Sequence, residues 1–409
     1  MIGPSSPTIR SLRICMGVWG SLRHDARVAR SAGSLARAGV SVTVVAASWR
    51  DEELGRRRHP LGFEAVTVRR RPPRGLEAGA AGAGPIRLAG WLVQSVPAYW
   101  RFMRELWRTS ADVYHAHDLQ ALPWVWLVAR LRRRPVVYDA HEISADRSGF
   151  RRIGRIVAAV EGALARRSAA MITTTDMRAD YFARAYGVPR PIVLQNRPHY
   201  AEPPRTRRLH DALGLPADAV VVLYQGGLQP HRGLFTLLDV VPDVPSAHFV
   251  FLGDGPLRSK LEARVRQRGL LTRVHFLPAV PWHELAVWTA AADVGVQLIE
   301  NTSLNHFTTD SNKLFEYVMA GLPVVASNFP EIRRIVTAYR LGELVDPADR
   351  SSIAAALRRL TTGEHLREQY RQNALAARRD LSWETQESEL LALYERIAPK
   401  RTTSSVGAP

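Results

Sequence analysis

The sequence predicts an α/β protein with two doubly wound parallel sheets, and three features of the chain support this prediction. Runs rich in Val and Ile recur between segments of helical length, and some, such as VTVVAAS, show no polar alternation. Such continuous apolar runs are typical of parallel strands that have helices on both faces. The alternation of strand and helix occurs twice along 409 residues, a length that favours two domains.

The expected strands follow the apolar runs in chain order. In the first half they lie near residues 11–18, 40–47, 64–69, 112–117, 135–140, 169–175 and 191–195. In the second half they lie near residues 219–225, 247–253, 273–277, 292–299, 322–327 and 341–345. The segment NRPHYAEPPRTRR, at 196–208, separates the halves because it is rich in proline and charge. We therefore expect domains at 1–199 and 200–379.

Two segments of the first half depart from this alternation. The glycine-rich stretch 75–85 is typical of a mobile loop. The helix expected over 86–108 carries three tryptophans together with several arginines. This composition fits a helix packed on the sheet, and it also fits a helix that contacts an anionic membrane.

The composition restricts the class of protein. Lys and Arg total 56 against 38 Asp and Glu, a formal charge of +18, but the basic residues are spread along the chain. No zinc-finger or RNP motif accompanies them. Attraction to phosphorylated ligands or to an anionic membrane explains the positive charge equally well. Because no nucleic-acid-binding motif is present, no nucleic-acid partner is expected.

Cysteine usage and hydropathy suggest the compartment. The single cysteine, Cys15, excludes a disulfide framework and a cysteine-based zinc site, and its apolar neighbours predict a buried thiol. The N-terminus has no signal-peptide core, and no apolar run reaches membrane-spanning length. We expect a cytoplasmic protein, with peripheral contact on the inner face of the cell membrane as a further possibility.

Polar residues gather where three strands of the first domain end. Ligands of open parallel sheets bind beyond the carboxyl ends of the strands, so this edge is the expected place for a site. The residues at or just after these strand ends are Gly17, Gly20, Asp25, Arg27, His115, His117, Asp118, Asp139, His141 and Glu142. Histidines and carboxylates could also bind a metal, but no H-E-x-x-H or comparable spacing is present. No metal is therefore expected.

Two glycine-rich turns follow strands of the second domain. One contains Gly226 and Gly227 and leads through Arg232 into a helix, and the other contains Gly253 and Gly255. Backbone N–H groups of such turns can approach a phosphate, which the helix dipole also attracts. The fingerprint G-x-G-x-x-G is incomplete, so an NAD-type site is not expected.

Lysine is rare in this chain, and one lysine lies at the start of a predicted helix. Only three of the 56 basic residues are lysines, and Lys313 lies three residues before Glu316. Ser311 or Asn312 is expected to cap a helix over 313–320. An anion there would meet free N–H groups and an ammonium, with a carboxylate one turn away. A nucleoside diphosphate, with its phosphates and ribose hydroxyls, would bind such a group of residues. The alternative interpretation is that Lys313 and Glu316 are an ordinary pair of charges on the protein surface.

With these residues, the chain resembles the family 4 glycosyltransferases of the GT-B fold over nearly its whole length. The resemblance rests on HDARVARSAGSLARAGVSVTVVA, HAHDLQALP, VVYDAHE, YQGGLQPHRGL, FLGDGPL, NKLFEYVMAGLPVVAS and LSWETQESELLALYERI. It implies two Rossmann-like domains facing each other across a cleft, the first for an acceptor and the second for a nucleotide-sugar donor. It also implies that a C-terminal helix at about 382–397, within 380–399, completes the first domain.

The resemblance assigns roles to single residues. Arg232 and Lys313 match the basic pair that neutralises the donor diphosphate, and Glu316 matches the glutamate that binds the ribose hydroxyls. His141 matches the histidine near the reacting sugar, and Val280 lies where the backbone reads the nucleobase. The other positions assigned to the sugar donor are Gly20, Gly227, Gly253, Gly255, Asn312 and Leu314. The positions assigned to the acceptor side are Asp25, Arg27, His117, Asp118 and Glu142.

Two positions depart from the family pattern. Thr308 stands where a glutamate often contacts the donor sugar, and Gly227 stands where an arginine is expected. Recognition of the sugar hydroxyls is therefore left open. A non-catalytic nucleotide-sugar-binding scaffold and a nucleotide-sugar epimerase of the same fold stay as alternatives.

The sequence contains no D-x-D motif, which many transferases use to hold a metal on the leaving diphosphate. A helix dipole, Arg232 and Lys313 can stabilise that charge without a metal, so no cofactor is expected. From the resemblance alone, the reaction retains the anomeric configuration, and the departing phosphate helps to take the acceptor proton. The expected acceptors are saccharides, lipid-linked saccharides or small molecules.

Overall fold

The structure is a computed structural model that describes residues 7–70, 85–147, 150 and 153–398. The chain divides into two compact units, which are described separately. Unit 1 runs to Leu194 and resumes at Gln386, and unit 2 runs Gln195–Thr385. These bounds differ by a few residues from the predicted division at 199 and 379. The loop predicted at 75–85 lies outside the described residues, apart from Pro85.

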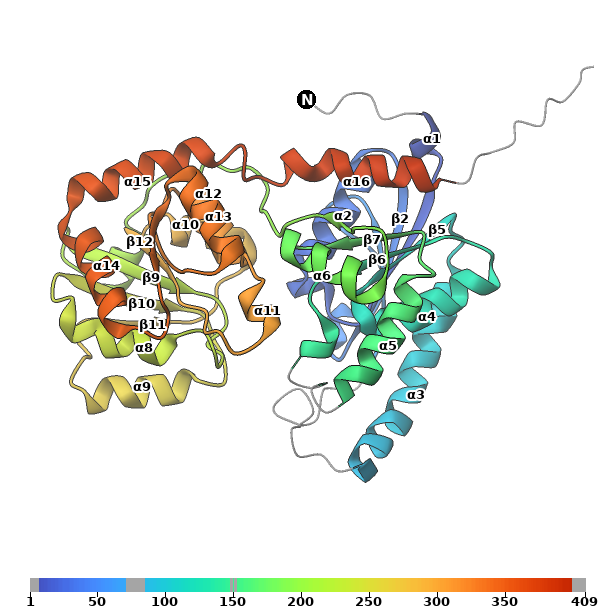
Figure 1. The fold of residues 1–409 in the computed structure, drawn as a ribbon, viewed down its shortest axis with the longest axis horizontal. Coiled ribbons are helices and arrows are strands. Elements are labelled where there is room, and N and C mark those ends of the chain that lie inside the picture. Colours follow the sequence, from blue (N-terminus) through green and yellow to red (C-terminus); the bar gives the residue numbers. More distant parts are fainter. Residues whose placement is uncertain (1–6, 71–84, 148–149, 151–152, 399–409) are drawn as a thin grey trace, which may run out of the picture. The chain divides into compact units, whose positions relative to one another are not determined.

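Unit 1 is built on an eight-stranded sheet in the order β3-β4-β2-β1-β5-β6-β7-β8 (Figure 1). Its strands are β1 Arg13–Val18, β2 Ser41–Ser48, β3 Gly55–Arg58, β4 Glu64–Arg69, β5 Val113–His117, β6 Val136–Ala140, β7 Ala170–Thr173 and β8 Ile192–Val193. Its helices are α1 Pro7–Arg10, α2 Ala26–Arg37, α3 Pro85–Arg108, α4 Asp118–Leu131, α5 Gly154–Ala165, α6 Asp176–Tyr186 and α16 Glu384–Ile397. The seven strands predicted in this half are confirmed.

The edge strand β3 was not predicted. All four of its residues, GRRR, are exposed, and it pairs antiparallel with β4 while the other strand pairs of the sheet are parallel. A strand without an apolar residue leaves no periodic pattern to detect. Its charged side chains instead protect the sheet edge from pairing with another chain.

Alternate residues of β5 show how helices cover both faces of this sheet. The Tyr114 side chain packs with Phe102 and Leu106 of α3 on one face. The next residue, His115, points to the other face, where it contacts Tyr394 of α16. Helix α3 therefore packs on the sheet, as one of its two sequence interpretations required. Cys15 is also buried, which raises the pKa of its thiol to about 12.

Unit 2 is built on a fully parallel six-stranded sheet in the order β11-β10-β9-β12-β13-β14. Its strands are β9 Val220–Gln225, β10 Ala247–Leu252, β11 Val274–Leu277, β12 Val294–Gln297, β13 Val324–Ser327 and β14 Gly342–Val345. Its helices are α7 Arg208–Leu213, α8 Leu234–Val240, α9 Arg258–Gln267, α10 Trp282–Thr289, α11 Leu304–Phe307, α12 Asn312–Ala320, α13 Pro330–Tyr339, α14 Arg350–Thr362 and α15 Glu364–Ala377. The order of the strands reverses between β9 and β12, where ligands of such sheets bind.

The six strands predicted in this half are confirmed, so both units have the doubly wound α/β architecture. Apolar side chains fill the space on each face of the second sheet, in one cluster with α8, α9 and α14 and another with α10, α12 and α13. Among the residues that the structure describes, no helix is long and apolar enough to cross a membrane.

Candidate functional site

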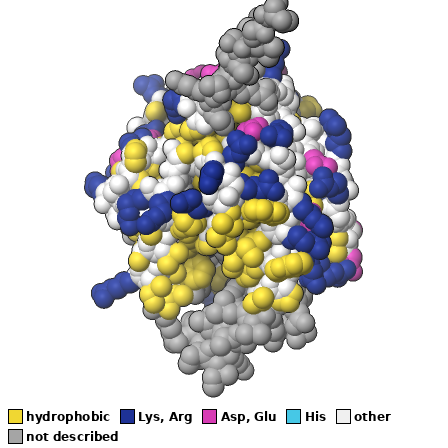
Figure 2. Space-filling view, turned by 90° about the vertical axis from the view of Figure 1, so that its right-hand side faces the viewer, with side chains coloured by type: hydrophobic (Ala, Val, Ile, Leu, Met, Phe, Trp, Pro, Cys, Tyr) yellow, Lys and Arg dark blue, Asp and Glu magenta, His cyan; other side chains and the backbone are white. Residues whose placement is uncertain are grey.

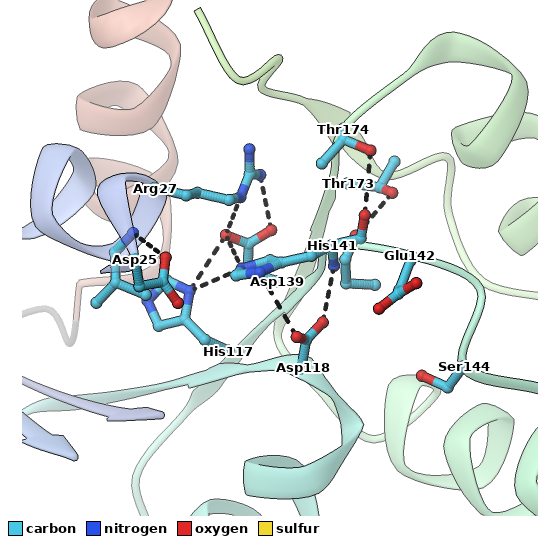
Figure 3. A network of polar contacts seen from close by, with 12 residues as sticks. Asp25, Arg27, His117, Asp118, Asp139, His141, Glu142, Ser144, Thr173 and Thr174 are labelled. Atoms are coloured by element: carbon cyan, nitrogen blue, oxygen red, sulfur yellow. Dashed lines mark hydrogen bonds and ion pairs between the residues drawn. The ribbon is translucent and has the colours of Figure 1, made fainter. Parts of the chain in front are cut away.

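The polar strand ends of unit 1 come together as the sequence predicted. Strands β1, β5 and β6 are neighbours, and their register places His117 beside Val18 and beside Asp139. His141 follows β6 directly. Figure 3 shows that these side chains, with Arg27 from α2 and Asp118 from the start of α4, form one polar network.

An ion pair between Arg27 and Asp139 lies at the centre of this network. Arg27 Nε is 2.8 Å from Asp139 Oδ2 and its NH2 group is 2.7 Å from Oδ1, with exposed side-chain fractions of only 5% and 1%. Arg27 also donates to the Leu194 carbonyl at 2.5 Å. Burial alone would raise the pKa of Asp139, but Arg27 and His141 hold it well below its usual value. The aspartate is therefore a buried, permanent anion.

Carboxylates surround the imidazole of His141. Its Nε2 lies 3.4 Å from Asp139 Oδ2 and 3.2 Å from His117 Nδ1, and its Nδ1 lies 3.6 Å from Asp118 Oδ2. Burial lowers the pKa of His141, but Asp118 and Asp139 outweigh it and raise the pKa to about 9. Unit 1 therefore presents a protonated imidazole at neutral pH, which is a strong hydrogen-bond donor.

Hydrogen bonds also fix the backbone N–H and carbonyl of His141. Asp118 has a left-handed φ of 61°, and its Oδ1 accepts from the His141 N–H at 3.2 Å. Arg178 donates to the His141 carbonyl at 2.7 Å and to Thr174 Oγ1 at 2.6 Å. A non-glycine residue with positive φ is a strained feature that tends to occur at functional sites. Arg178 and Thr174 were missed from the sequence because they lie in a segment without a recognisable motif.

The other positions assigned to unit 1 have different surroundings. Asp25 caps α2 by accepting from Val28 N at 3.1 Å, so it has a helix-capping role. Glu142 pairs with Arg147 at 2.8 Å, and burial raises its pKa. Gly20 lies after β1, and a Cβ there would meet no atom within 4 Å. Contact of these residues with a ligand stays a prediction.

Three residues of this network could by distance alone hold a metal. Ligand atoms of His115, His117 and Asp139 lie within 4.8 Å of one another. Arg27 occupies both oxygens of Asp139, however, and the protonated His141 adds a second positive charge beside it. His115 Nδ1 contacts the Tyr394 hydroxyl, whereas Nε2 of His115 and Nε2 of His117 have no hydrogen-bond partner among the described residues. The positive charges at Asp139 do not fit a divalent cation, whose ligands must be free and deprotonated.

In unit 2 the predicted helix of the SNKLFEY motif is α12, and it begins at Asn312. Gly321 ends it with a left-handed φ of 74°, so the helix stops where the predicted range 313–320 stops. The capping prediction was wrong, because Ser311 stands at the N-cap but its side chain accepts no hydrogen bond from the helix. The N-cap position has a φ of 58°, which is not the extended conformation of a capping serine. The Ser311 side chain therefore does not take up the N–H groups at this helix start.

Lys313 is half-buried, not exposed as the surface-pair interpretation assumed. Its Nζ lies 5.4 Å from the centre of the Tyr224 ring. Burial, and then the nearby Arg232, lower the pKa of the lysine to about 8, while Glu316 acts in the opposite direction. Gly226, with a φ of 113°, provides the space, since a Cβ there would lie 3.0 Å from Lys313 Cε. The ammonium is thus held close to a second cation, an arrangement that favours an anion between them.

Glu316 is held by a residue that sequence reasoning missed. Gln225, the last residue of β9, donates to Glu316 Oε2 at 2.6 Å, and its own Oε1 accepts from Thr289 Oγ1 at 2.7 Å. Gln225 and Thr289 are both buried. A glutamine at a strand end has no distinctive sequence signal, so only the structure links it to Glu316. The carboxylate keeps one oxygen for another hydrogen-bond donor.

The glycine turns of unit 2 pack backbone against backbone. A Cβ at Gly253 would lie 2.1 Å from the Gly226 carbonyl oxygen, and one at Gly255 would lie 2.5 Å from that of Leu228. Leu228 N also donates to Asp254 O at 3.0 Å. These glycines are explained by the close approach of two turns, and their contact with a phosphate stays a prediction.

The remaining assigned positions of unit 2 vary in exposure. Leu314 is fully buried in the core, so only its backbone could meet a ligand. Val280 packs at the edge of the same core, whereas Asn312 is exposed. Thr308 is buried, and its hydroxyl donates to Leu304 O at 2.7 Å. The hydroxyl proton of this threonine is therefore used within its own helical turn, and a neutral hydroxyl differs from the carboxylate often found at this position.

Comparisons with known proteins agree with this architecture. The model of "Glycosyl transferase 4-like domain" matches residues 25–197, and that of "Glycosyl transferases group 1" matches residues 206–376. A D-inositol 3-phosphate glycosyltransferase of Jonesia denitrificans is 26% identical over 312 residues, covering 70% of this chain and 72% of its own. A phosphatidyl-myo-inositol mannosyltransferase of Mycobacterium leprae is 30% identical over 190 residues, covering 45% and 49%.

Solved structures share the fold. Sucrose-phosphate synthase from Thermosynechococcus elongatus has a TM-score of 0.74 at 18% identity, covering 94% of this chain and 99% of its own. Anabaena HepE, solved in complex with UDP-glucose, has a TM-score of 0.72 at 18% identity, covering 94% and 100%. Two parallel-sheet α/β units, each matched by a glycosyltransferase model, define the class of this protein as a glycosyltransferase. The chain belongs to the family 4 glycosyltransferases of the GT-B fold.

Proposed function

We propose that this enzyme transfers a sugar from a nucleoside-diphosphate sugar, bound at unit 2, to a saccharide, lipid-linked or small-molecule acceptor at unit 1. The observation that supports this most is the start of α12. There the half-buried Lys313 lies near Arg232, and Glu316 is oriented by Gln225. The complex of HepE with UDP-glucose makes UDP-sugars the first donors to test.

The proposed mechanism follows from charge. As the glycosidic bond breaks, negative charge grows on the terminal phosphate, and Lys313, Arg232 and the α12 dipole stabilise it. The acceptor hydroxyl attacks the anomeric carbon from the face that the phosphate leaves, and its proton passes to the departing phosphate. The products are the glycoside and the nucleoside diphosphate, with the anomeric configuration retained. The protonated His141 donates a hydrogen bond to the reacting sugar.

A panel of nucleotide sugars tests this function in two stages. Thermal shift identifies the donor, because binding to the folded state raises the melting temperature. Product analysis with and without candidate acceptors then separates the alternatives. Transfer or slow donor hydrolysis supports the transferase, an isomerised nucleotide sugar indicates an epimerase, and binding without turnover indicates a scaffold.

Replacement of Glu316 by Ala should weaken binding of the nucleoside diphosphate. Loss of a charge-assisted hydrogen bond to ribose is worth about 1.5–3 kcal/mol, or about 10–150-fold in Kd. The measurement is calorimetric titration. Glu368→Ala, at a half-exposed helix carboxylate on α15, is the matched control and should leave Kd unchanged. Unchanged affinity in Glu316→Ala would show that Glu316 does not bind the ribose of the nucleotide.

Turnover should persist in excess chelator, because the leaving diphosphate is stabilised by protein cations and a helix dipole. The measurement compares initial rates in EDTA, magnesium and manganese. Loss of activity in EDTA with recovery on adding either metal would contradict the proposal.

We also propose that unit 1 contacts an anionic membrane through α3, α4 and α5. Exposed apolar side chains lie on all three helices or next to them, namely Val96, Trp100, Trp107, Leu127, Leu131, Ile153, Ile156 and Val160. Figure 2 shows a hydrophobic area on this face with Lys and Arg side chains beside it. Arginines accompany the tryptophans directly, since Arg104 lies 5.2 Å from the Trp100 ring and Arg132 lies 4.5 Å from that of Trp107. Apolar side chains flanked by arginines complement an anionic bilayer.

Sedimentation with vesicles tests this contact. The protein should co-sediment with vesicles that contain anionic phosphatidylglycerol at low salt and not with vesicles of phosphatidylcholine alone. Trp100→Ser with Ile156→Ser, at sites 56% and 64% exposed, should reduce the bound fraction without lowering stability. Absence of binding to anionic vesicles, or concentration-dependent dimerisation through this face, would contradict the membrane proposal.

A further inference from the structure

The C-terminal helix α16 contributes a buried hydroxyl to the strand beneath the histidine site. Tyr394 and His115 are both 0% exposed, and the Tyr394 hydroxyl lies 2.6 Å from His115 Nδ1. Burial raises the pKa of Tyr394 and lowers that of His115, so the tyrosine keeps its proton and the histidine is neutral. A neutral imidazole carries its proton on one nitrogen only, so this hydrogen bond couples the His115 tautomer to the orientation of the Tyr394 hydroxyl.

His115 in turn supports the ring of His117. The two residues point to the same face of β5, and their rings stack with centres 4.2 Å apart and planes at 22°. His117 Nδ1 lies 3.2 Å from His141 Nε2 and 3.3 Å from Asp139 Oδ2. A continuous series of contacts therefore leads from Tyr394 through His115 and His117 to His141.

We propose that Tyr394 is a positioning residue of the transfer reaction, whose hydroxyl fixes the tautomer and orientation of His115 and thereby the orientation of His141. This inference rests on the proposed role of His141 in transfer. The hydrogen bond of the Tyr394 hydroxyl within the described network goes to His115, so its orienting effect passes through the two intervening imidazole rings, while the charge of Asp139 acts on Tyr394 only by raising its pKa. The groups that face His141 directly are His117, Asp118 and Asp139, with Arg27 behind Asp139.

A role in positioning differs from a role in packing alone. Tyr394→Phe keeps the ring volume but leaves His115 Nδ1 without its hydrogen-bond partner, so the imidazole can change tautomer and turn. Loss of packing alone would lower stability and leave the site unchanged. The neighbouring Tyr114 on β5 provides the matched control, because its hydroxyl is also in the sheet core but donates to the Thr109 carbonyl at 3.1 Å. Tyr114→Phe also removes a buried hydroxyl of unit 1, but one that does not contact His115, His117 or His141.

The experiment uses the full chain with isotope-labelled histidine. Nitrogen shifts report the His115 tautomer, and a pH titration reports the His141 pKa, with His141→Gln and His115→Asn assigning the signals. We expect Tyr394→Phe to change the His115 tautomer, to shift the His141 titration and to lower kcat about 10–100-fold at unchanged KM for the sugar donor. Tyr114→Phe should change none of these.

His115→Asn tests the same contacts from the second residue, since its amide can still form a hydrogen bond with Tyr394 but the ring that stacks on His117 is removed. It should also shift the His141 titration. Wild-type titration of His141 in both Tyr394→Phe and His115→Asn would overturn the proposal. The NMR readouts do not require turnover, so they separate failure of this inference from failure of the proposed transferase reaction.

Discussion

Replacement of Lys313 by Met is expected to lower kcat by roughly 10²–10³, as for removal of one oxyanion donor, and to weaken binding of the sugar donor much less. Charge on the terminal phosphate grows as the bond to the sugar breaks, so the ammonium interacts more strongly with the transition state than with the ground state. Lys260→Met, at an exposed lysine on α9, is the matched control and should behave as wild type. Steady-state kinetics against the identified donor measure both variants.

Two further features of this site refine the expectation. Lys313→Arg should recover only part of the activity, because Gly226 leaves room for a narrow ammonium stem and not for a planar guanidinium. Lys313→Met should not lower the melting temperature, since it removes a charge whose burial is unfavourable. Normal turnover of Lys313→Met would show that Lys313 does not stabilise the leaving phosphate.

The charge of Lys313 also predicts a pH dependence. Its pKa of about 8 lies below that of an ordinary lysine, because burial disfavours the charged form. Below pH 8 this burial therefore lowers the stability of the free protein. The penalty disappears as the pH rises from the pKa of the folded state towards that of the unfolded state. Affinity for the diphosphate should fall as the pH rises through about 8 in wild type, and this step should be absent in Lys313→Met.

Replacement of Arg27 by Met is expected to have the largest effect on stability, a loss of about 3–5 kcal/mol in the free energy of unfolding. The substitution leaves the buried carboxylate of Asp139 without its bidentate partner. Because the folded pKa of Asp139 is depressed, the stabilisation that it provides is present above the unfolded pKa and is lost as the pH falls through the folded value. Urea unfolding at neutral pH measures the change.

Arg13 offers the matched control for this substitution. It pairs with Asp112 at 3.0 Å in a similar bidentate geometry, but its side chain is 47% exposed. A pair open to solvent contributes about 0–1 kcal/mol, so Arg13→Met should have a small effect. If Arg27→Met lowers the free energy of unfolding by no more than Arg13→Met does, the buried ion pair does not stabilise the site.

The gathering of His117, Asp139 and His141 could be predicted because parallel strands end at one edge of a sheet, whatever the sequence distance between them. Lys313 and Glu316 could be predicted because both lie within one helical turn. These are local patterns combined with one topological rule. Both doubly wound sheets could be predicted from a different pattern, the alternation of continuous apolar runs with segments of helical length.

Other features depend on contacts that no local pattern records. Tyr394 meets His115 across 279 residues, and Gln225 reaches Glu316 across 91. Ser311 has the right residue type for a cap but a backbone conformation that prevents it. Arg27 was assigned to the acceptor side by family resemblance, and only its burial identifies it as the partner of Asp139.

The most direct test of the central claim compares the affinities of a nucleoside diphosphate and the matching monophosphate in the presence of EDTA. The free diphosphate carries on its terminal phosphate the charge that develops during transfer. We predict that wild type binds the diphosphate at least about 10-fold more tightly, by analogy with a charge-assisted contact. Lys313→Met should lose most of this difference and keep its affinity for the monophosphate. Equal preference in both proteins, or a preference that appears only with added magnesium, would contradict a metal-free diphosphate site at the start of α12.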